Sequence, residues 1–161
     1  MSYDINATDL QDEAEVTRLA KQRYSIVEKL DVGGMAEIFI AQSTGVGGIQ
    51  KRVAIKRILP NLTKNQRFVN MFLDEARLCM YLNHANIVQV FDVGKADGTY
   101  FIVMEYVEGT NLREIFQQVS ETGQHLAVEF AVYIIAEVCK GMAHAHESQS
   151  PAGEALEIVH R

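Results

Sequence analysis

A lysine and a glutamate occupy apolar positions of two predicted elements, and this pair constrains the fold more than any other feature. Residues 52–58 alternate as a half-buried strand does, with Val53 and Ile55 on the face opposite to Lys56. Glu75 falls inside a stripe of apolar residues at helical spacing, formed by Phe68, Met71, Phe72, Leu78, Cys79 and Leu82. A carboxylate that faces a core is costly without a cation, so Lys56 is its expected partner. The alternative is a glutamate at the edge of the stripe and a lysine that reaches water.

Composition narrows the class of protein. The chain has 161 residues, of which 48% are hydrophobic and 22% charged, as expected for one modest domain or part of a larger one. The net charge of −6 argues against a general nucleic-acid binder. No apolar run approaches the roughly 18 residues of a membrane span, and no secretory signal is expected. Cys79 and Cys139 have no metal or redox spacing, which fits buried thiols in a cytoplasmic protein.

The pattern along the chain predicts an α+β organisation. Residues 1–22 are acid-rich and are expected to form a flexible tail, with a short helix over 14–20. Strand patterns and turn signals then predict five strands and one main helix, followed after Gly109 by a short helix and a long apolar one. The predicted strands cover residues 24–30, 36–43, 52–58, 87–93 and 100–106, and the predicted helices cover 64–82, 111–119 and 126–147.

Several short motifs recur in one order. Val53-Ala54-Ile55-Lys56 follows a glycine-containing turn, Gly33-Gly34-Met35-Ala36-Glu37-Ile38-Phe39. His84-Ala85-Asn86-Ile87-Val88 follows the glutamate helix, and Ile158-Val159-His160-Arg161 ends the chain. From Tyr24 to Arg161 this set resembles the bacterial, eukaryotic-like serine/threonine protein kinases. The resemblance implies a kinase-like small lobe over residues 23–107, built of a five-stranded antiparallel sheet and one main helix and ending in the hinge. Residues 108–161 would be the first helices of the large lobe.

The resemblance also implies a site for ATP with magnesium. Lys56 would hold the α- and β-phosphates, positioned by an ion pair with Glu75. The other positions that match the family's nucleotide site are the apolar roof (Leu30, Ile38 and Ala54), the loop glycines (Gly33 and Gly34), the residue at the back of the pocket (Met104), the hinge residues (Glu105 and Val107) and a ribose contact (Asn111).

The glycine-containing loop departs from the family's Gly-x-Gly-x-x-Gly pattern. Only the middle glycine, Gly33, is kept; Ala36 takes the third place and Asp31 the first. Asp31 sets a negative charge near the expected triphosphate. Taken alone, the loop fits a plain hairpin turn equally well. A dinucleotide-binding fingerprint is excluded because a strand, not a helix, follows, and no Walker loop is present.

The catalytic half of the family's site is not in these 161 residues. His160 and Arg161 match the opening of the catalytic loop, and the sequence stops before the aspartate. The base and the magnesium ligands are therefore expected beyond Arg161, and this fragment is expected to be inactive. A protein substrate is expected for the full-length parent. The alternatives are a pseudokinase or nucleotide-binding scaffold, and a small α+β binding domain unrelated to kinases.

The predicted long helix contains a pair of histidines and an apolar face. His144 and His146 lie two residues apart and point to different faces, which makes a poor metal pair. Without the rest of a large lobe, one apolar face of this helix is expected to be partly exposed, at Phe130, Ile134, Val138 and Met142.

Overall fold

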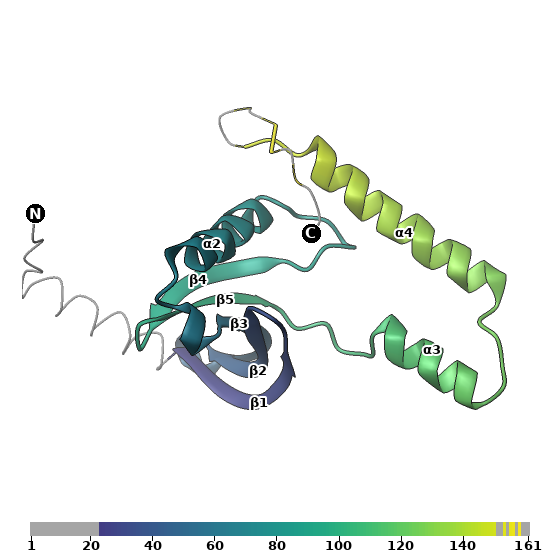
Figure 1. Ribbon diagram of the computed structural model, residues 1–161, viewed down its shortest axis with the longest axis horizontal. Helices are drawn as coiled ribbons and strands as arrows, with labels where there is room; N and C mark the ends of the chain where they lie inside the picture. Colours follow the sequence, from purple (N-terminus) through teal and green to yellow (C-terminus); the bar gives the residue numbers. More distant parts are fainter. Residues whose placement is uncertain (1–22, 151–152, 154, 157, 159–161) are drawn as a thin grey trace, which may run out of the picture. The chain divides into compact units, whose positions relative to one another are not determined.

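The computed structural model describes residues 23–150 together with 153, 155, 156 and 158 (Figure 1). The expected acidic tail and the terminal His160-Arg161 lie outside the described residues. Contacts divide the chain into two compact units. The first contains the described residues up to Met80 and Val90–Tyr106, and the second contains Tyr81–Gln89 and the residues from Val107 onward. The sequence did not indicate that Tyr81–Gln89 group with the second unit.

The first unit is built on one antiparallel sheet with strand order β1-β2-β3-β5-β4. The strands are β1 (Tyr24–Val32), β2 (Ala36–Thr44), β3 (Gln50–Ile58), β4 (Val90–Ala96) and β5 (Thr99–Glu105). Short 3-10 turns, η1 (Val46–Gly48) and η2 (Pro60–Leu62), flank β3. The five predicted strands are therefore present. Strand β4 starts at Val90 rather than at the predicted position 87, since Ile87 packs in the second unit near Gly141.

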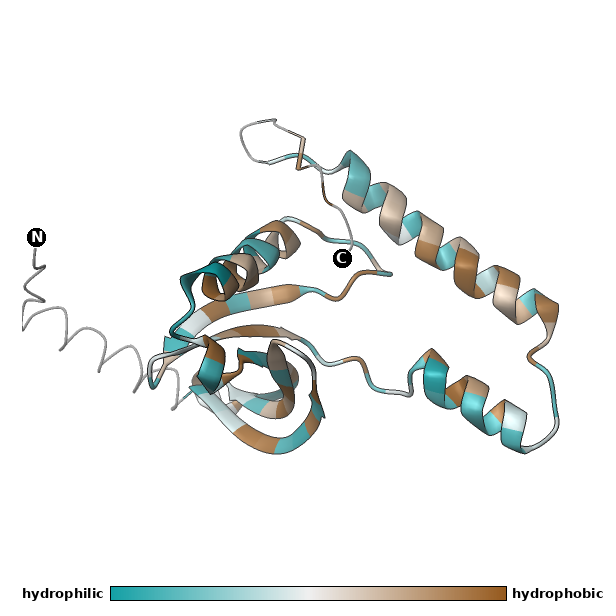
Figure 2. Ribbon diagram, viewed as in Figure 1, coloured by the Kyte–Doolittle hydropathy of each residue, from teal (hydrophilic) through white to brown (hydrophobic). Residues whose placement is uncertain are grey.

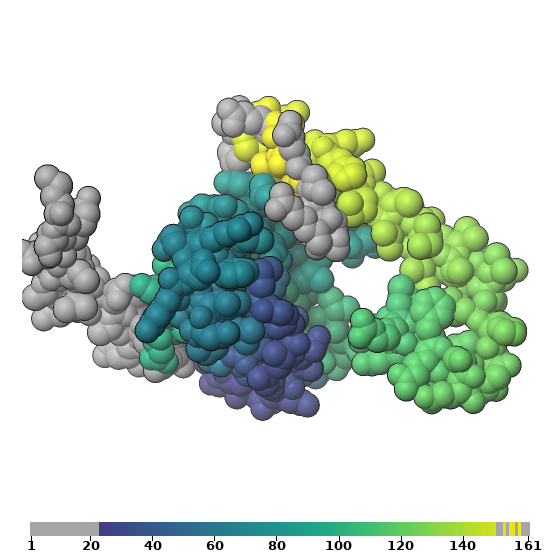
Figure 3. Space-filling view, in the orientation of Figure 1, coloured from purple at the N-terminus to yellow at the C-terminus, as the bar shows by residue number. Residues whose placement is uncertain are grey.

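Alternation along the strands gives the sheet two distinct faces, as the pattern of residues 52–58 predicts, and each face carries an apolar cluster. One face holds a core with the helix α2 (Gln66–Met80), made of Ala36, Ile58, Val69, Phe72, Ala76 and Ile102. The other face holds a second cluster, made of Ala41, Val53, Ile55, Phe101 and Val103. In Figure 3 this unit, coloured purple to teal, forms a continuous mass of side chains. Lys56 lies on the face that α2 covers.

The sheet curls so that its two edge strands meet. The Tyr24 hydroxyl, on β1, donates a hydrogen bond of 3.1 Å to Asp92 on β4, although 68 residues separate the two. Tyr24 also packs edge-on against Phe101, with ring centroids 6.3 Å apart. Gly94 faces Phe101 across the β4–β5 pair, and a side chain at Gly94 would collide with that ring. These contacts join the two edge strands around an aromatic cluster on the face opposite to α2.

Helix α2 begins after Asn65, whose side chain accepts a hydrogen bond of 3.1 Å from the Arg67 amide. Such capping satisfies an amide that has no partner within the helix. The buried positions of α2 are Val69, Phe72 and Ala76, which lie at helical spacing and face the sheet. The helix is two residues shorter at each end than the predicted range of 64–82.

The second unit contains α3 (Leu112–Glu121) and α4 (Val128–Glu147). The loop at Asn86 packs on α4: Asn86 Nδ2 donates to the Glu137 carbonyl oxygen at 3.0 Å and to its carboxylate at 2.7 Å. Gly141 gives this loop room, since a Cβ there would lie 3.4 Å from the Asn86 Cβ. Much of α4 is apolar (Figure 2). Phe130 and Val138 on this helix are exposed, as expected. Ile134 and Met142 are half-buried, which also agrees with the expected partial exposure.

No helix among the residues that the structure describes is both long enough and apolar enough to cross a lipid bilayer.

Candidate functional site

The strand register places four of the predicted site residues on one face of the first unit. Ile38 pairs with Lys56 and Lys56 with Ile102, in one row across β2, β3 and β5. In the next row, Ala54 pairs with Met104. Because directly opposed residues of an antiparallel pair project to the same face, Ile38, Ala54, Lys56 and Met104 share the face that α2 covers. The sheet itself therefore brings together an ammonium group and an apolar surface beside it.

Lys56 and Glu75 form the predicted ion pair. Lys56 Nζ, on β3, lies 2.6 Å from Glu75 Oε1, on α2. The ammonium group also lies 6.0 Å from the ring centroid of Phe72, which is 5% exposed. A cation at this range of an aromatic face is attracted by the ring quadrupole. Lys56 is thus held between a rigid strand, a buried ring and one carboxylate.

The pair is more open than the sequence pattern suggests. The side chain of Lys56 is 25% exposed and that of Glu75 is 49% exposed. The expectation that Glu75 faces the core from inside an apolar stripe is therefore wrong. The buried line of α2 passes through Ala76, and Glu75 precedes it by one residue, about 100° around the helix. Glu75 sits at the border of the buried face, where water reaches its carboxylate and lowers the cost of its charge.

One thiol lies close to this pair. Cys79 follows Glu75 by one helical turn. Burial raises the pKa of the Cys79 thiol above its ordinary value, and the Glu75 carboxylate raises it further, while Lys56 opposes the change. The thiol therefore stays protonated at neutral pH. Cys79 is half-buried and Cys139 is exposed, so the expectation of two buried thiols is wrong for Cys139, which lies on an open face of α4.

The glycine-containing loop forms the hairpin between β1 and β2. The Gly33 amide donates to the Ala36 carbonyl oxygen at 2.8 Å, which closes the turn. A Cβ built on Gly34 meets no atom within 4 Å, and one on Gly33 meets only the Ala36 oxygen at 3.6 Å. Neither glycine has a positive φ. The turn itself therefore does not require glycine at these positions, which leaves close approach of a ligand to the backbone as a reason for them.

Leu30 and Asp31 lie where β1 departs from regular pairing. Lys29 pairs with Phe39 and Asp31 pairs with Ile38, so Leu30 is the extra residue of a bulge. Leu30 is 46% exposed. Asp31 Oδ1 accepts a hydrogen bond of 2.7 Å from the Val32 amide. The bulge therefore brings Leu30 and Asp31 together opposite Ile38.

The remaining predicted residues do not all lie in the first unit. Glu105 ends β5, while Val107 and Asn111 belong to the second unit. Val107 is 62% exposed. The Asn111 side chain caps α3, where its Oδ1 accepts a hydrogen bond of 3.0 Å from the Glu114 amide. In this structure Asn111 thus has a local structural role, in addition to the ribose contact that the resemblance implies.

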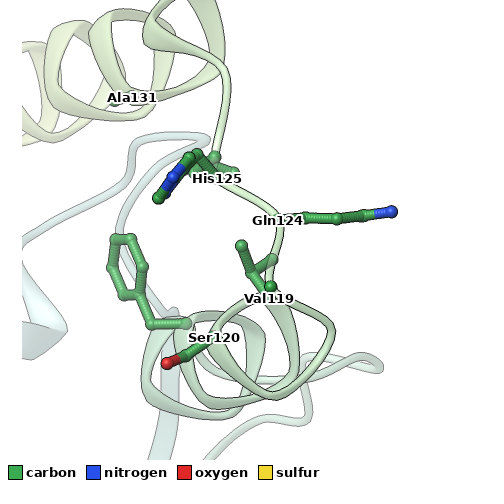
Figure 4. A pocket seen from close by; sticks show the side chains of 8 residues that line it. Val119, Ser120, Gln124, His125 and Ala131 are labelled. Carbon is green, nitrogen blue, oxygen red and sulfur yellow. The ribbon is translucent and has the colours of Figure 1, made fainter.

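Two hollows lie away from the lysine–glutamate pair. One of about 440 Å³ opens between α3 and the start of α4 in the second unit (Figure 4). Its only polar side chains are Ser120, Gln124 and His125. The other, of about 160 Å³, lies on the concave face of the sheet beside Tyr24 and Phe101. Among the described residues no group of three metal-ligating side chains is present. Lys56 and Glu75 remain the candidate centre.

The architecture agrees with comparisons to known proteins. The family model for protein tyrosine and serine/threonine kinases matches residues 24–154. The chain belongs to the protein kinase family. It is 41% identical over 138 residues to the tyrosine-protein kinase MasK of Myxococcus xanthus, and 34% identical over 139 residues to the serine/threonine-protein kinase PrkC of Bacillus subtilis. Each comparison covers 86% of this chain, but only 21% of MasK and 19% of PrkC. The chain thus spans about a fifth of the length of these curated kinases.

Solved structures of kinases show the same fold. The kinase domain of Mycobacterium tuberculosis PknI matches with a TM-score of 0.62 and 26% sequence identity, over 78% of this chain and 48% of that one. The five-stranded sheet with α2 is therefore a kinase small lobe, and the following helices are the start of a large lobe. This confirms the predicted fold class and the resemblance to bacterial kinases.

Sequence reasoning missed Phe72 as a neighbour of Lys56, because it counted this residue only as part of an apolar stripe. The available signal was spacing: Phe72 precedes Glu75 by three residues, so the two share a helix face. It also missed the position of Asp31 in the lysine row, since a bulge cannot be read from residue types alone.

Proposed function

We propose that this kinase chain binds ATP through its small lobe and that Lys56 holds the α- and β-phosphates. The observation that carries the proposal is the ion pair of Lys56 and Glu75 at 2.6 Å, on a sheet face whose neighbouring row is apolar. A planar apolar base needs such a surface, and a polyphosphate needs a fixed cation beside it. Within the proposal, Glu75 is a positioning residue, while Leu30, Ile38, Ala54 and Met104 contact the base.

The loop between β1 and β2 supports the phosphate end of the proposal. Gly33 and Gly34 tolerate a Cβ sterically and have ordinary backbone angles, so the turn does not explain them. Their lack of side chains allows backbone amides to approach phosphate oxygens. Glu105 and Val107 are proposed to offer backbone groups to the adenine edge and Asn111 to reach the ribose.

The proposed reaction of the parent protein is transfer of the γ-phosphoryl group to a serine or threonine of a protein substrate. Positioning and neutralisation of charge account for most catalysis of this kind. The small lobe supplies the phosphate anchor. An aspartate that accepts the hydroxyl proton and side chains that hold magnesium complete the family's site, and no motif within these 161 residues matches them. We therefore propose that the 161-residue chain by itself binds nucleotide without transferring phosphate.

The test is a titration of the purified chain with ATP and magnesium, followed by calorimetry. The wild type is expected to bind, and Lys56→Met is expected to weaken binding at least tenfold. Lys64→Met is the matched control, because Lys64 is exposed and lies outside β3 and the lysine row. Equal affinity of the wild type and Lys56→Met would refute the proposed anchor.

A second experiment separates a kinase from a nucleotide-binding scaffold. The scaffold is the second candidate because the carboxylate of Asp31 lies in the row of the proposed phosphate anchor. Transfer of labelled phosphate to a protein substrate is measured for the 161-residue chain and for a chain extended through the catalytic and activation segments. Lys56-dependent transfer by the extended chain alone supports the kinase. Binding without transfer in either chain supports the scaffold.

A further inference from the structure

Asp31 stands in the same cross-strand row as the phosphate-anchoring lysine. Asp31 pairs with Ile38 on β2, and Ile38 pairs with Lys56 on β3. Two strand spacings, about 10 Å in total, therefore separate the backbones of the carboxylate and the ammonium residues. Because paired residues share a face, both side chains project to the side that α2 covers. A polyphosphate held by Lys56 on that face would lie within about 10 Å of Asp31.

The carboxylate of Asp31 is fixed in place but not neutralised. Its Oδ1 accepts the Val32 amide at 2.7 Å, next to the bulge at Leu30. Among the ion pairs between described residues, none includes Asp31; the cations Lys29 and Arg57 instead both pair with Glu37. The hydrogen bond fixes the carboxylate at the end of β1, at the edge of the lysine row.

We infer that Asp31 makes nucleotide binding selective for the magnesium complex over the metal-free nucleotide. The inference rests on the proposed function. Magnesium removes about two negative charges from a triphosphate. At this range and in partly solvated surroundings, repulsion between two unit charges changes affinity about two- to fivefold for each charge. Asp31 therefore penalises metal-free ATP about tenfold more than the magnesium complex. The charge acts as a specificity determinant that rejects an unproductive ligand before any catalytic group is engaged.

The same geometry offers a structural reading, in which Asp31 only holds the bulge. Asp92 is an example of this structural role, because its Oδ1 also accepts a hydrogen bond from the amide of the next residue, Val93, at a register shift in β4. An asparagine keeps the acceptor oxygen and removes the charge, whereas an alanine removes both. Asp31→Asn therefore isolates the electrostatic role, and Asp31→Ala adds the loss of the hydrogen bond.

The experiment measures ATP affinity of the 161-residue chain by calorimetry, with excess magnesium and with a chelator, at low and at high salt. The proteins are the wild type, Asp31→Asn, Asp31→Ala and, as a control with the same local hydrogen bond, Asp92→Asn. Thermal melts establish that each variant is folded. We expect Asp31→Asn to strengthen binding of metal-free ATP about tenfold more than binding of the magnesium complex. The difference is expected to shrink at high salt, because salt screens exposed charges. Asp92→Asn is expected to leave the ratio of the two affinities unchanged.

The outcomes separate this inference from the proposed function. If the wild type binds ATP through Lys56 and Asp31→Asn changes both affinities equally or not at all, the inference is refuted and the proposed function stands. A change seen in Asp31→Ala but not in Asp31→Asn assigns Asp31 to the bulge and also refutes the inference. Metal-free binding that appears only in Asp31→Asn supports it. If no protein of the set binds ATP in either condition, the proposed function and the inference both fail.

Discussion

Removing the ion pair between Lys56 and Glu75 tests how much the pair contributes to the stability of the fold. The perturbations are Lys56→Met, Glu75→Gln and the double variant, which together form a double-mutant cycle. Methionine keeps the length of the lysine stem and its packing, and glutamine keeps the shape of the glutamate. The cycle isolates the interaction energy of the pair. The contact of Lys56 with Phe72 is lost whether or not Glu75 is present, so it cancels when the effects of Lys56→Met in the two backgrounds are subtracted.

The magnitude follows from the geometry and exposure of the pair. Two unit charges about 4 Å apart attract by about 1 kcal/mol in water and about 4 kcal/mol near a protein surface. With Lys56 25% exposed and Glu75 49% exposed, solvent screening and the ordering of two long side chains offset most of that attraction. The coupling free energy of unfolding is therefore expected to be about 0.5–1 kcal/mol. A fully buried pair loses about 3–5 kcal/mol when one partner is removed.

The assay is urea unfolding followed by circular dichroism, at low and at high ionic strength. We expect the small coupling to decrease further as salt is added, since the pair is open to solvent. A coupling above about 2 kcal/mol that salt does not change would refute the argument from exposure. Nucleotide affinity is measured on the same proteins, and a large effect of Lys56→Met on affinity beside a small effect on stability is the expected signature of a binding residue.

Three further predictions concern packing and acid stability. Gly94→Ala is expected to cost about 1–3 kcal/mol of unfolding free energy, because the new Cβ would lie 2.9 Å from Cε1 of the Phe101 ring. Phe101→Leu should relieve most of that cost. Additive effects of the two substitutions in a double-mutant cycle would contradict the predicted collision. Gly141→Leu is expected to lower the melting temperature through contact with the loop at Asn86, whereas the control Ala143→Leu, at an exposed position on the same helix, should not. Hydrogen bonds from Lys29 and then Arg57 hold the pKa of Glu37 below its ordinary value of 4.5. A carboxylate whose pKa is lowered in the folded state stabilises the fold at pH values above its unfolded-state pKa, and this stabilisation is lost as the pH falls through its folded-state pKa. Acid titration should therefore destabilise the wild type below about pH 4.5 more steeply than Glu37→Gln. Parallel stability curves for the two proteins would contradict the role of Glu37.

Local patterns predicted the parts of the fold that depend on neighbouring residues. Alternation in β3 gave the two faces of the sheet, and it placed Lys56 opposite Val53 and Ile55 correctly. The glycine-containing turn marked the hairpin between β1 and β2. The pairing of Lys56 with Glu75 also followed, because a strand and the next helix pack together in so short a connection.

The features that the sequence did not predict depend on contacts between residues distant in sequence or on the exact rotation of a helix about its axis. The hydrogen bond from Tyr24 to Asp92 joins edge strands that are 68 residues apart, and no periodicity reports it. The exposure of Glu75 depends on which line of α2 is buried. Large apolar residues on both sides of that line widened the predicted stripe, while the small Ala76, 1% exposed, marks its true centre.

The two partners of the ion pair are held with different strength, and this difference bears on the proposed function. Lys56 is fixed by its row in the sheet, between Ile38 and Ile102. Glu75 depends on the placement of α2, which is anchored through Phe72 and Ala76 against the sheet. An open ion pair adds little to stability, so Glu75 is expected to contribute mainly by positioning Lys56. The sheet therefore defines where the proposed phosphate anchor stands, and the packing of α2 decides whether Glu75 reaches it.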